Sequence, residues 1–429
     1  MDKRAIEEYT KLEKEKNLSK IRLKRMAYEA MNEEAEKEEV TRRSTRIMNA
    51  KRKKTVPNFN GHDSISLPQV NGTLGSNLLQ IGYETAVIDQ KTRYFSCISK
   101  NQIVDLSNFR DGSQMKQLHI SPTSKILNKI SSKMVKVPEV ELDMYFNSKK
   151  ITNSTAAKQA CDKLQVLHPK NDRERSLKKI ILHVLEQHGY QSYMLSDKYI
   201  HKCTEQSLII KFWGPIFESY FGYSMDTFIQ WGDSLSKHTD KACSTIRLDL
   251  RIVIQNDGGD IESMAGEFAS ATAATGSKYY TDKTKIVLIS KVHLNQVLSA
   301  LNIPSKEDVV SIRIPMIQIM GMNCNIYSLS LVDKRTYRVE DVCDFIYPTT
   351  LRQIKNGTLA TMINSMEMLK LMIEELHAHI SNFSCDTSNK VTRFTKGKKP
   401  DKSVNIEEWI SDLIPINDSD SEEESSEEI

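Results

Sequence analysis

The sequence predicts an α+β fold in which helices flank a sheet core. Two stretches, residues 247–270 and 309–332, alternate apolar and polar side chains at the period of a strand and turn at glycines. Apolar residues recur at helical spacing in three long stretches, residues 173–191, 278–301 and 350–380. Because helical stretches come before, between and after the strand pairs, we expect one domain over residues 156–385.

The segments outside this domain have a different composition. Residues 1–40 lack Pro and Gly and are rich in Glu, Lys, Arg and Ala, which predicts a charged, solvated helix. Residues 41–155 have too few apolar side chains to offset the entropy of ordering, so we expect a basic, mostly irregular arm. Residues 386–429 predict a basic linker and an acidic, disordered tail. The amphipathic stretch 405–415 within them is expected to dock on a partner or on the protein's own core.

Charge is organised in blocks, although the net charge is only +4. Two basic clusters with a short polar spacer are typical of a bipartite nuclear import signal, which predicts a nuclear protein with an import receptor as a partner. The clusters consist of Arg42, Arg43, Lys51, Arg52, Lys53 and Lys54. The same charges would bind DNA or RNA through their phosphates. An ordinary solvated basic linker is the alternative.

Several protein classes have no support in the sequence. The seven cysteines form no C-x-x-C pair, which indicates reduced thiols of the cytosol or nucleus rather than a disulfide framework. No apolar stretch approaches the ~20 residues of a membrane span, so we expect no membrane partner. The glycine-rich phosphate loops of nucleotide-binding enzymes are absent.

Asp249 and Glu267 stand in the middle of the two strands predicted within residues 247–270. Strands disfavour Asp, and like charges opposite each other destabilise a sheet. If the turn places Asn256 opposite Asp260, the register sets Asp249 opposite Glu267; a two-residue turn at the same glycines would shift this pairing by one residue. Carboxylates roughly 5 Å apart at their β-carbons can share a divalent cation, and Mg²⁺ suits oxygen ligands next to phosphate.

The alternative for these acids is an ordinary solvated sheet face. In that case Asp249 pairs with Arg247, Arg251 or a helix lysine, and the two acids have no chemical role.

The stretch "RLDLRIVIQNDGGDIESMAGEFAS", with a helix before it and another after it, resembles the core of the PD-(D/E)XK superfamily, the restriction-endonuclease-like nucleases. It also resembles a poorly characterised group of fungal proteins. The resemblance covers roughly residues 205–380. It implies a Mg²⁺-dependent nuclease whose metal is bound by Asp249 and Glu267. The family has a lysine two residues after the glutamate, where this chain has Ala269.

A lysine from the following helix can replace the one missing from the strand. We expect Lys283 or Lys285 in this catalytic role; Lys278 is a weaker candidate and Lys291 lies farther along the helix. Thr281 or Asp282 is placed to cap that helix. An active nuclease and an inactive nuclease-like core both stay open.

The second hypothesis is a non-enzymatic chromatin-associated or scaffold module, in which the charged arms supply the interactions. Only the nuclease requires Asp249, Glu267 and a lysine amine to converge within reach of one metal ion.

Overall fold

The computed structural model describes residues 61–132, 147–222, 226–235, 246–255, 259–383 and 403–414. The charged helix expected over residues 1–40, the basic clusters from Arg42 to Lys54, and the acidic tail beyond residue 414 lie outside the described residues. The nuclear location and the import receptor therefore stay predictions from the sequence.

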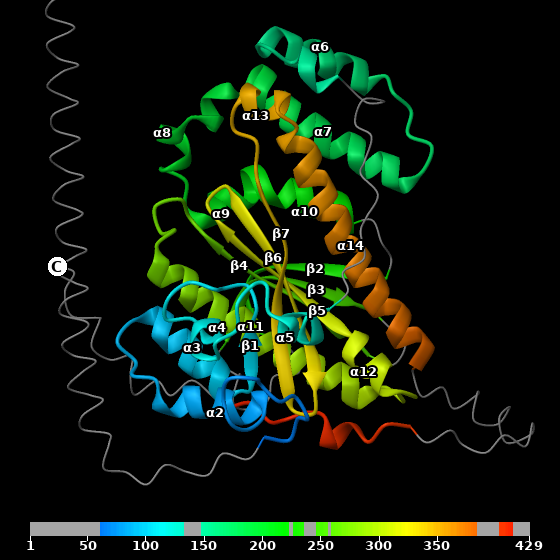
Figure 1. The fold of residues 1–429 in the computed structure, drawn as a ribbon. Helices are drawn as coiled ribbons and strands as arrows, with labels where there is room; N and C mark the ends of the chain where they lie inside the picture. The colour runs from blue at the N-terminus through cyan, green and yellow to red at the C-terminus, as the bar shows by residue number, and fades with distance from the viewer. Residues whose placement is uncertain are drawn as a thin grey trace, which may run out of the picture. The chain divides into compact units, whose positions relative to one another are not determined.

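In the described residues, a seven-stranded mixed sheet forms the core, with strand order β1-β7-β6-β5-β4-β3-β2 (Figure 1). The strands are β1 (Ile103–Asp105), β2 (Thr227–Leu235), β3 (Arg247–Ile254), β4 (Ile261–Ala269), β5 (Arg313–Met320), β6 (Asn323–Asp333) and β7 (Thr336–Ile346). The pairs β1/β7 and β4/β5 are parallel, and the other pairs are antiparallel. The predicted α+β class, a sheet flanked by helices, is confirmed.

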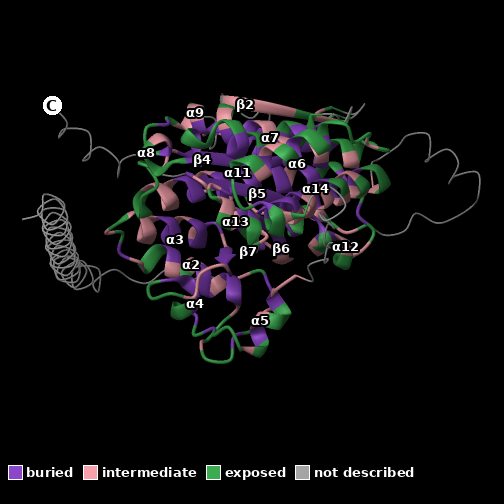
Figure 2. Cartoon of the chain, turned by 90° about the horizontal axis from the view of Figure 1, so that it is seen from above, coloured by how far each residue is buried: buried purple, intermediate pink, exposed green. Residues whose placement is uncertain are grey.

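The long helices cover both faces of this sheet. Along β4, Glu267 contacts Lys285 of α11, whereas the ring of Phe268 contacts Trp231, which in turn contacts Phe217 of α10. Successive side chains of a strand point to opposite faces, so α11 lies on one face and α10 on the other. Figure 2 shows the buried residues gathered between these layers. The helices are α2 (Leu74–Glu84), α3 (Gln90–Lys100), α4 (Gln114–Gln117), α5 (Lys125–Ile130), α6 (Ser154–Gln165), α7 (Asp172–Tyr190), α8 (Asp197–Ile200), α9 (Glu205–Leu208), α10 (Gly214–Phe221), α11 (Gly276–Ala300), α12 (Lys306–Ser311), α13 (Leu351–Lys355) and α14 (Thr358–Phe383).

The expectation of a mostly irregular arm is wrong for residues 61–132. This segment forms α2 to α5, and β1 extends the sheet by pairing with β7. Many of its apolar side chains are buried: Tyr94, Phe95 and Ile98 of α3 belong to the same core cluster as the central strands, and residues such as Leu74 and Met115 form a second, smaller cluster within the segment. Packing within the segment and against the rest of the chain thus supplies the burial that the low apolar density did not predict.

A buried ion pair joins this segment to α11. Lys283 Nζ lies 2.9 Å from Asp105 Oδ2 and donates to Ser107 Oγ at 2.6 Å. Tyr94 donates to the same Asp105 oxygen at 2.7 Å, and the Lys283 ammonium lies 4.4 Å from the ring centroid of Tyr327. Burial alone would raise the pKa of Asp105, but Lys283 and these hydrogen bonds outweigh it and lower the pKa.

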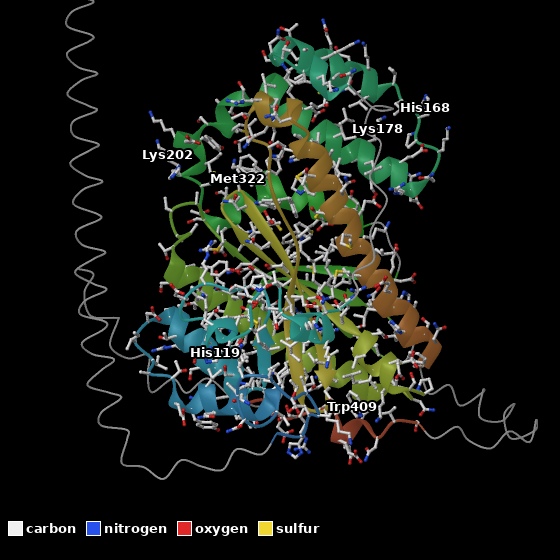
Figure 3. All side chains as sticks on the ribbon, in the orientation of Figure 1. His119, His168, Lys178, Lys202, Met322 and Trp409 are labelled. Atoms are coloured by element: carbon white, nitrogen blue, oxygen red, sulfur yellow. The ribbon has the colours of Figure 1, made fainter. Side chains whose placement is uncertain are left out.

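The segment 403–414 docks on the protein's own core, one of the two outcomes expected for it. Trp409 is 4% exposed (labelled in Figure 3). The side chain of Asn101 accepts from Ile414 N at 2.9 Å and donates to Ile414 O at 3.0 Å. Lys291 of α11 donates to Asp412 O at 3.0 Å. The same helix therefore contacts both the N-terminal segment and this C-terminal one.

We expect Lys283→Met to destabilise the protein by about 3 kcal/mol, because it leaves the Asp105 charge buried without its partner. The measurement is the free energy of unfolding from urea titration at neutral pH. Lys306→Met, a change at an exposed position of α12, is the control and should alter stability by less than about 0.5 kcal/mol. Equal stabilities of the two variants would contradict the structural role of the pair.

Candidate active site

The hairpin of β3 and β4 brings the two predicted acids together. Leu250 pairs with Gly266 and Arg251 with Ala265, so the next positions along the strands, Asp249 and Glu267, oppose each other. The predicted register is confirmed over this part of the hairpin. Asp249 Oδ2 also accepts a hydrogen bond of 2.8 Å from the backbone N–H of Phe268, which fixes its carboxylate beside β4.

Nearer the turn, the hairpin contains a β-bulge that strand alternation did not predict. Ile252 pairs with Met264, but Val253 pairs with Glu262, so β4 has one more residue than β3 between these pairs. Beyond the bulge the two faces of β4 exchange. Glu262 thus comes to the face of Arg251 and lies 2.6 Å from its guanidinium, both side chains being buried. Arg251, one of the partners considered for Asp249, therefore forms its ion pair with Glu262.

Of the two lysines predicted for catalysis, only Lys285 lies at the acids. Its Nζ is 3.1 Å from Glu267 Oε2, and the side chain is 34% exposed. Lys283 does not lie at the acids, because its ammonium is buried against Asp105. Residues two apart on a helix differ by about 200° in direction, so these two lysines project from nearly opposite sides of α11. Lys291 contacts Asn101 and is not part of the site.

Two further acids complete the site and were not predicted. Asp282 of α11 is fully buried, 2.8 Å from Lys278 Nζ and 4.0 Å from Lys285 Nζ. Glu205 of α9 lies against Asp249, close enough for the two carboxyl groups to share a proton in a hydrogen bond. The i, i+4 and i, i+3 spacings of Asp282 to the two lysines were visible in the sequence. Nothing in the sequence pointed to Glu205.

The expected cap of α11 was also wrong, and this explains why Asp282 was overlooked. The helix begins at Gly276, with Thr275 as its N-cap accepting from Lys278 N. Asp282 therefore lies inside the helix, on the side that carries Lys278 and Lys285, and not at its end.

Three buried oxygen atoms at this place have no hydrogen-bond donor. They are Glu267 Oε1, Asp282 Oδ2 and Gln318 Oε1. Gln318 is the β5 residue paired with Glu267, and its amide donates to Tyr279 O at 2.7 Å. A buried acceptor without a donor costs free energy. Carboxylate and amide oxygens are the ligand types that Mg²⁺ takes, so a cation at this place would satisfy them.

The electrostatics of the site also favour a cation. Burial raises the pKa of Glu267 to about 8; Asp249 and Asp282 add to the increase, and Lys285 opposes it. Burial and the neighbouring Asp249 raise the pKa of Glu205 to about 7. Burial likewise raises the pKa of Asp282. Burial and neighbouring carboxylates thus raise the pKa of three acids at this place, Glu205, Glu267 and Asp282, and the charge of a divalent cation would offset the same repulsion.

Within the described part of the chain, no group of three or more His, Cys, Asp or Glu side chains is arranged as a metal-ligand set. A cation at this place would therefore have at most two of these acids as ligands, such as the hairpin pair, together with the Gln318 amide. Mg²⁺ often keeps several waters and uses one or two carboxylates plus substrate phosphate. None of the described helices is long and apolar enough to cross a membrane.

Glu267 should make the protein less stable as pH rises. Its carboxyl group holds a proton in the folded state up to about pH 8, while the unfolded chain releases it near the ordinary pKa of 4.5. The folded state therefore binds the extra proton, and raising the pH favours unfolding. Between pH 5 and pH 8 we expect this group to cost about 3 kcal/mol of unfolding free energy.

The measurement is urea unfolding across this pH range without divalent cations. Glu267→Gln should match the wild type near pH 5 and exceed its stability near pH 8, because the amide mimics the protonated acid. Parallel pH profiles for the two proteins would show that Glu267 is ionised in the folded state.

No protein-family model matches the chain, and no curated protein or solved structure matches it either. The chemistry of the site is therefore inferred from its own residues.

Proposed function

We propose that this protein is a Mg²⁺-dependent nuclease with a restriction-endonuclease-like core. The observation that carries the proposal is the convergence of Asp249, Glu267 and the Lys285 amine, beside buried oxygens that lack donors. This convergence was the requirement that separated a nuclease from a scaffold module, and it favours the nuclease. The substrate class is nucleic acid, DNA or RNA, whose phosphodiester bond is hydrolysed.

The order of elements supports the resemblance to the PD-(D/E)XK core. Helix α10 is followed by β2, by β3 with Asp249, by a turn, and by β4 with Glu267. Helix α11 then crosses to β5, which is parallel to β4. Apart from the additional strand β2, which the sequence did not predict, this is the order of helix, Asp strand, turn, Glu strand and helix on which the resemblance was based.

A lysine of helix α11 can take the place of the lysine that this chain lacks on the strand. Ala269 stands two residues after Glu267, where the family has its lysine, and the amine beside Glu267 belongs to Lys285 instead. Burial alone would lower the pKa of Lys285, but Glu267 and Asp282 outweigh it and raise the pKa. The side chain thus stays an ammonium at neutral pH. We assign it to hydrogen bonding and charge stabilisation at the attacked phosphate, since an ammonium cannot accept a proton.

Each residue then has a role in hydrolysis. Asp249 and Glu267, with the Gln318 amide oxygen, would hold Mg²⁺, which lowers the pKa of bound water and neutralises phosphate charge. Glu205, whose pKa is about 7, is suited to accept the proton of the attacking water. The water oxygen forms a bond to phosphorus, one P–O ester bond breaks, and the leaving oxygen takes a proton from solvent.

Cation binding should depend on both hairpin acids. We expect isothermal titration of the full-length protein to show Mn²⁺ or Mg²⁺ binding, and Asp249→Asn and Glu267→Gln each to weaken it at least tenfold, because each removes a charged oxygen ligand. Glu307→Gln, an exposed acid of α12, is the matched control and should bind as the wild type does. A wild-type protein that binds neither ion would overturn the proposal.

Lys285→Met should separate cation binding from cleavage. We expect the cation affinity to persist and the cleavage rate to fall by about 100-fold or more, as when one electrostatic stabiliser is removed. The assay uses single- and double-stranded DNA and RNA with Mg²⁺, and Lys306→Met is the surface control. Unchanged cleavage by Lys285→Met would refute its role. A cation-binding protein that cleaves none of the four substrates would be an inactive nuclease-like core.

A further inference from the structure

A pocket of about 380 Å³ lies beside the candidate active site. Its walls are mainly apolar, from Ile209, Ile210, Pro215 and Trp231, with Gln206 and Glu218 as the polar lining residues. This volume is at the lower end of the roughly 300–1,000 Å³ of small-molecule sites. It admits one flat ring system and is too small for a helix or a folded segment.

Helix α9 connects the pocket to the carboxylates. Glu205 lies against Asp249, and the next residue, Gln206, lines the pocket. On the sheet, Trp231 of β2 pairs with Leu250 of β3, the neighbour of Asp249. Cross-strand partners share a face, so Trp231 and Asp249 project to opposite faces. In the described residues β2 is the last strand of the sheet, so a nucleic-acid strand at the acids would pass around this edge to reach the pocket.

One wall of the pocket, Trp231, is held by side-chain contacts, and the rim at Ile210 is partly uncovered. The Trp231 indole donates to Glu218 at 2.6 Å, and its ring lies edge-on to Phe217 with centroids 6.0 Å apart. Ile210 is 64% exposed although it is apolar. It belongs to the π-helical turn Ile209–Trp213, a form of helix frequent at functional sites.

We propose that this pocket receives an unpaired nucleobase of the strand whose phosphate lies at Asp249 and Glu267. A nucleobase has two apolar faces for the aromatic and aliphatic walls and a polar edge for the Gln206 amide. A base paired within a duplex is stacked between its neighbours and has no free face for the pocket. The substrate is therefore single-stranded or locally unpaired nucleic acid. This inference rests on the proposed function, because it takes its strand from the cation site.

The test measures binding of a fluorescein-labelled single strand of about 12 thymidines to full-length protein by anisotropy, with Mg²⁺ present. All proteins carry Lys285→Met to prevent cleavage. In a series of strands, one abasic site is moved a nucleotide at a time. We expect one position at which the missing base weakens binding about tenfold, the effect of losing one base–aromatic stack.

Variants of the pocket connect this position to Trp231. Trp231→Leu should bind the intact strand about tenfold more weakly and lose the effect of the abasic site, whereas Trp231→Phe should retain most of both. Ile210→Glu, at the exposed rim, should also weaken binding, and it avoids the risk that a change at Trp231 disturbs folding. Tyr190→Leu replaces a 57% exposed aromatic side chain of α7 and is the matched control.

The outcomes separate this inference from the proposed function. Equal affinity of the wild-type and Trp231→Leu pockets, no position dependence, or tighter binding of a duplex of the same length would overturn the base pocket. If Mn²⁺ still binds in those cases, the cation site stands without the pocket. If instead Mn²⁺ does not bind but the strand binds in a Trp231-dependent way, the pocket stands and the nuclease does not.

Discussion

The ion pair between Lys283 and Asp105 fixes the rotation of α11, and both sides of the candidate site depend on that rotation. Taking two charges out of water is costly unless their remaining hydrogen-bonding groups are satisfied. Here Ser107 and Tyr94 supply the additional hydrogen bonds. With Lys283 held against β1, Lys285 is directed to the opposite side of the helix, where Glu267 lies. A shift by one residue would turn the helix by about 100° and remove Lys285 from Glu267.

At the candidate site, the carboxyl groups that would bind a cation also lower the stability of the fold. Four carboxyl groups occur within one small region, and burial raises the pKa of Glu267 to about 8 and that of Glu205 to about 7. A fold selected for stability alone would gain from neutral side chains at these positions. The same crowding is what a divalent cation needs, because its charge offsets the repulsion and the desolvation together. Perturbed pKa values of this kind gather at functional sites.

The hairpin of β3 and β4 could be predicted from the sequence, but the residues that surround it in the fold could not. Next to the turn Ile254 pairs with Ile261, one residue off the predicted register, and a bulge restores that register before Asp249. Alternation and the glycine turn predicted Asp249 opposite Glu267 but left a shift by one residue open. They did not reveal the bulge near Glu262, since one extra residue leaves the local pattern unchanged on each side of it. To choose between Lys283 and Lys285 from the sequence, one would need to know where α11 begins. The N-cap of this helix is Thr275, whereas the sequence predicted a cap at Thr281 or Asp282.

Features that depend on contacts between distant parts of the chain could not be predicted from local sequence patterns. Residues 61–132 look irregular by composition, but they fold through a small apolar cluster of their own and through contacts with strands and helices far along the chain. Glu205 joins the site from a helix of four residues that the sequence gives no reason to notice. Its partner Asp249 is 44 residues away in the sequence, and the two carboxyl groups meet only in the folded chain. Pairwise rules within one helix or hairpin do not reach such distances.

The buried oxygens without donors connect these observations to function. Lys285 is bonded to one oxygen of Glu267, which leaves Oε1 without a donor, and Asp282 and Gln318 each contribute another such atom. More hydrogen bonds from the protein could have satisfied them, as Ser107 and Tyr94 do for Asp105 on the other side of the same helix. One side of α11 thus faces a buried ion pair, Lys283 with Asp105, that has additional hydrogen bonds. The other side faces buried carboxyl oxygens that have no donor. The satisfied pair stabilises the fold, and in the proposed nuclease the unsatisfied acceptors would face an ion and its substrate phosphate.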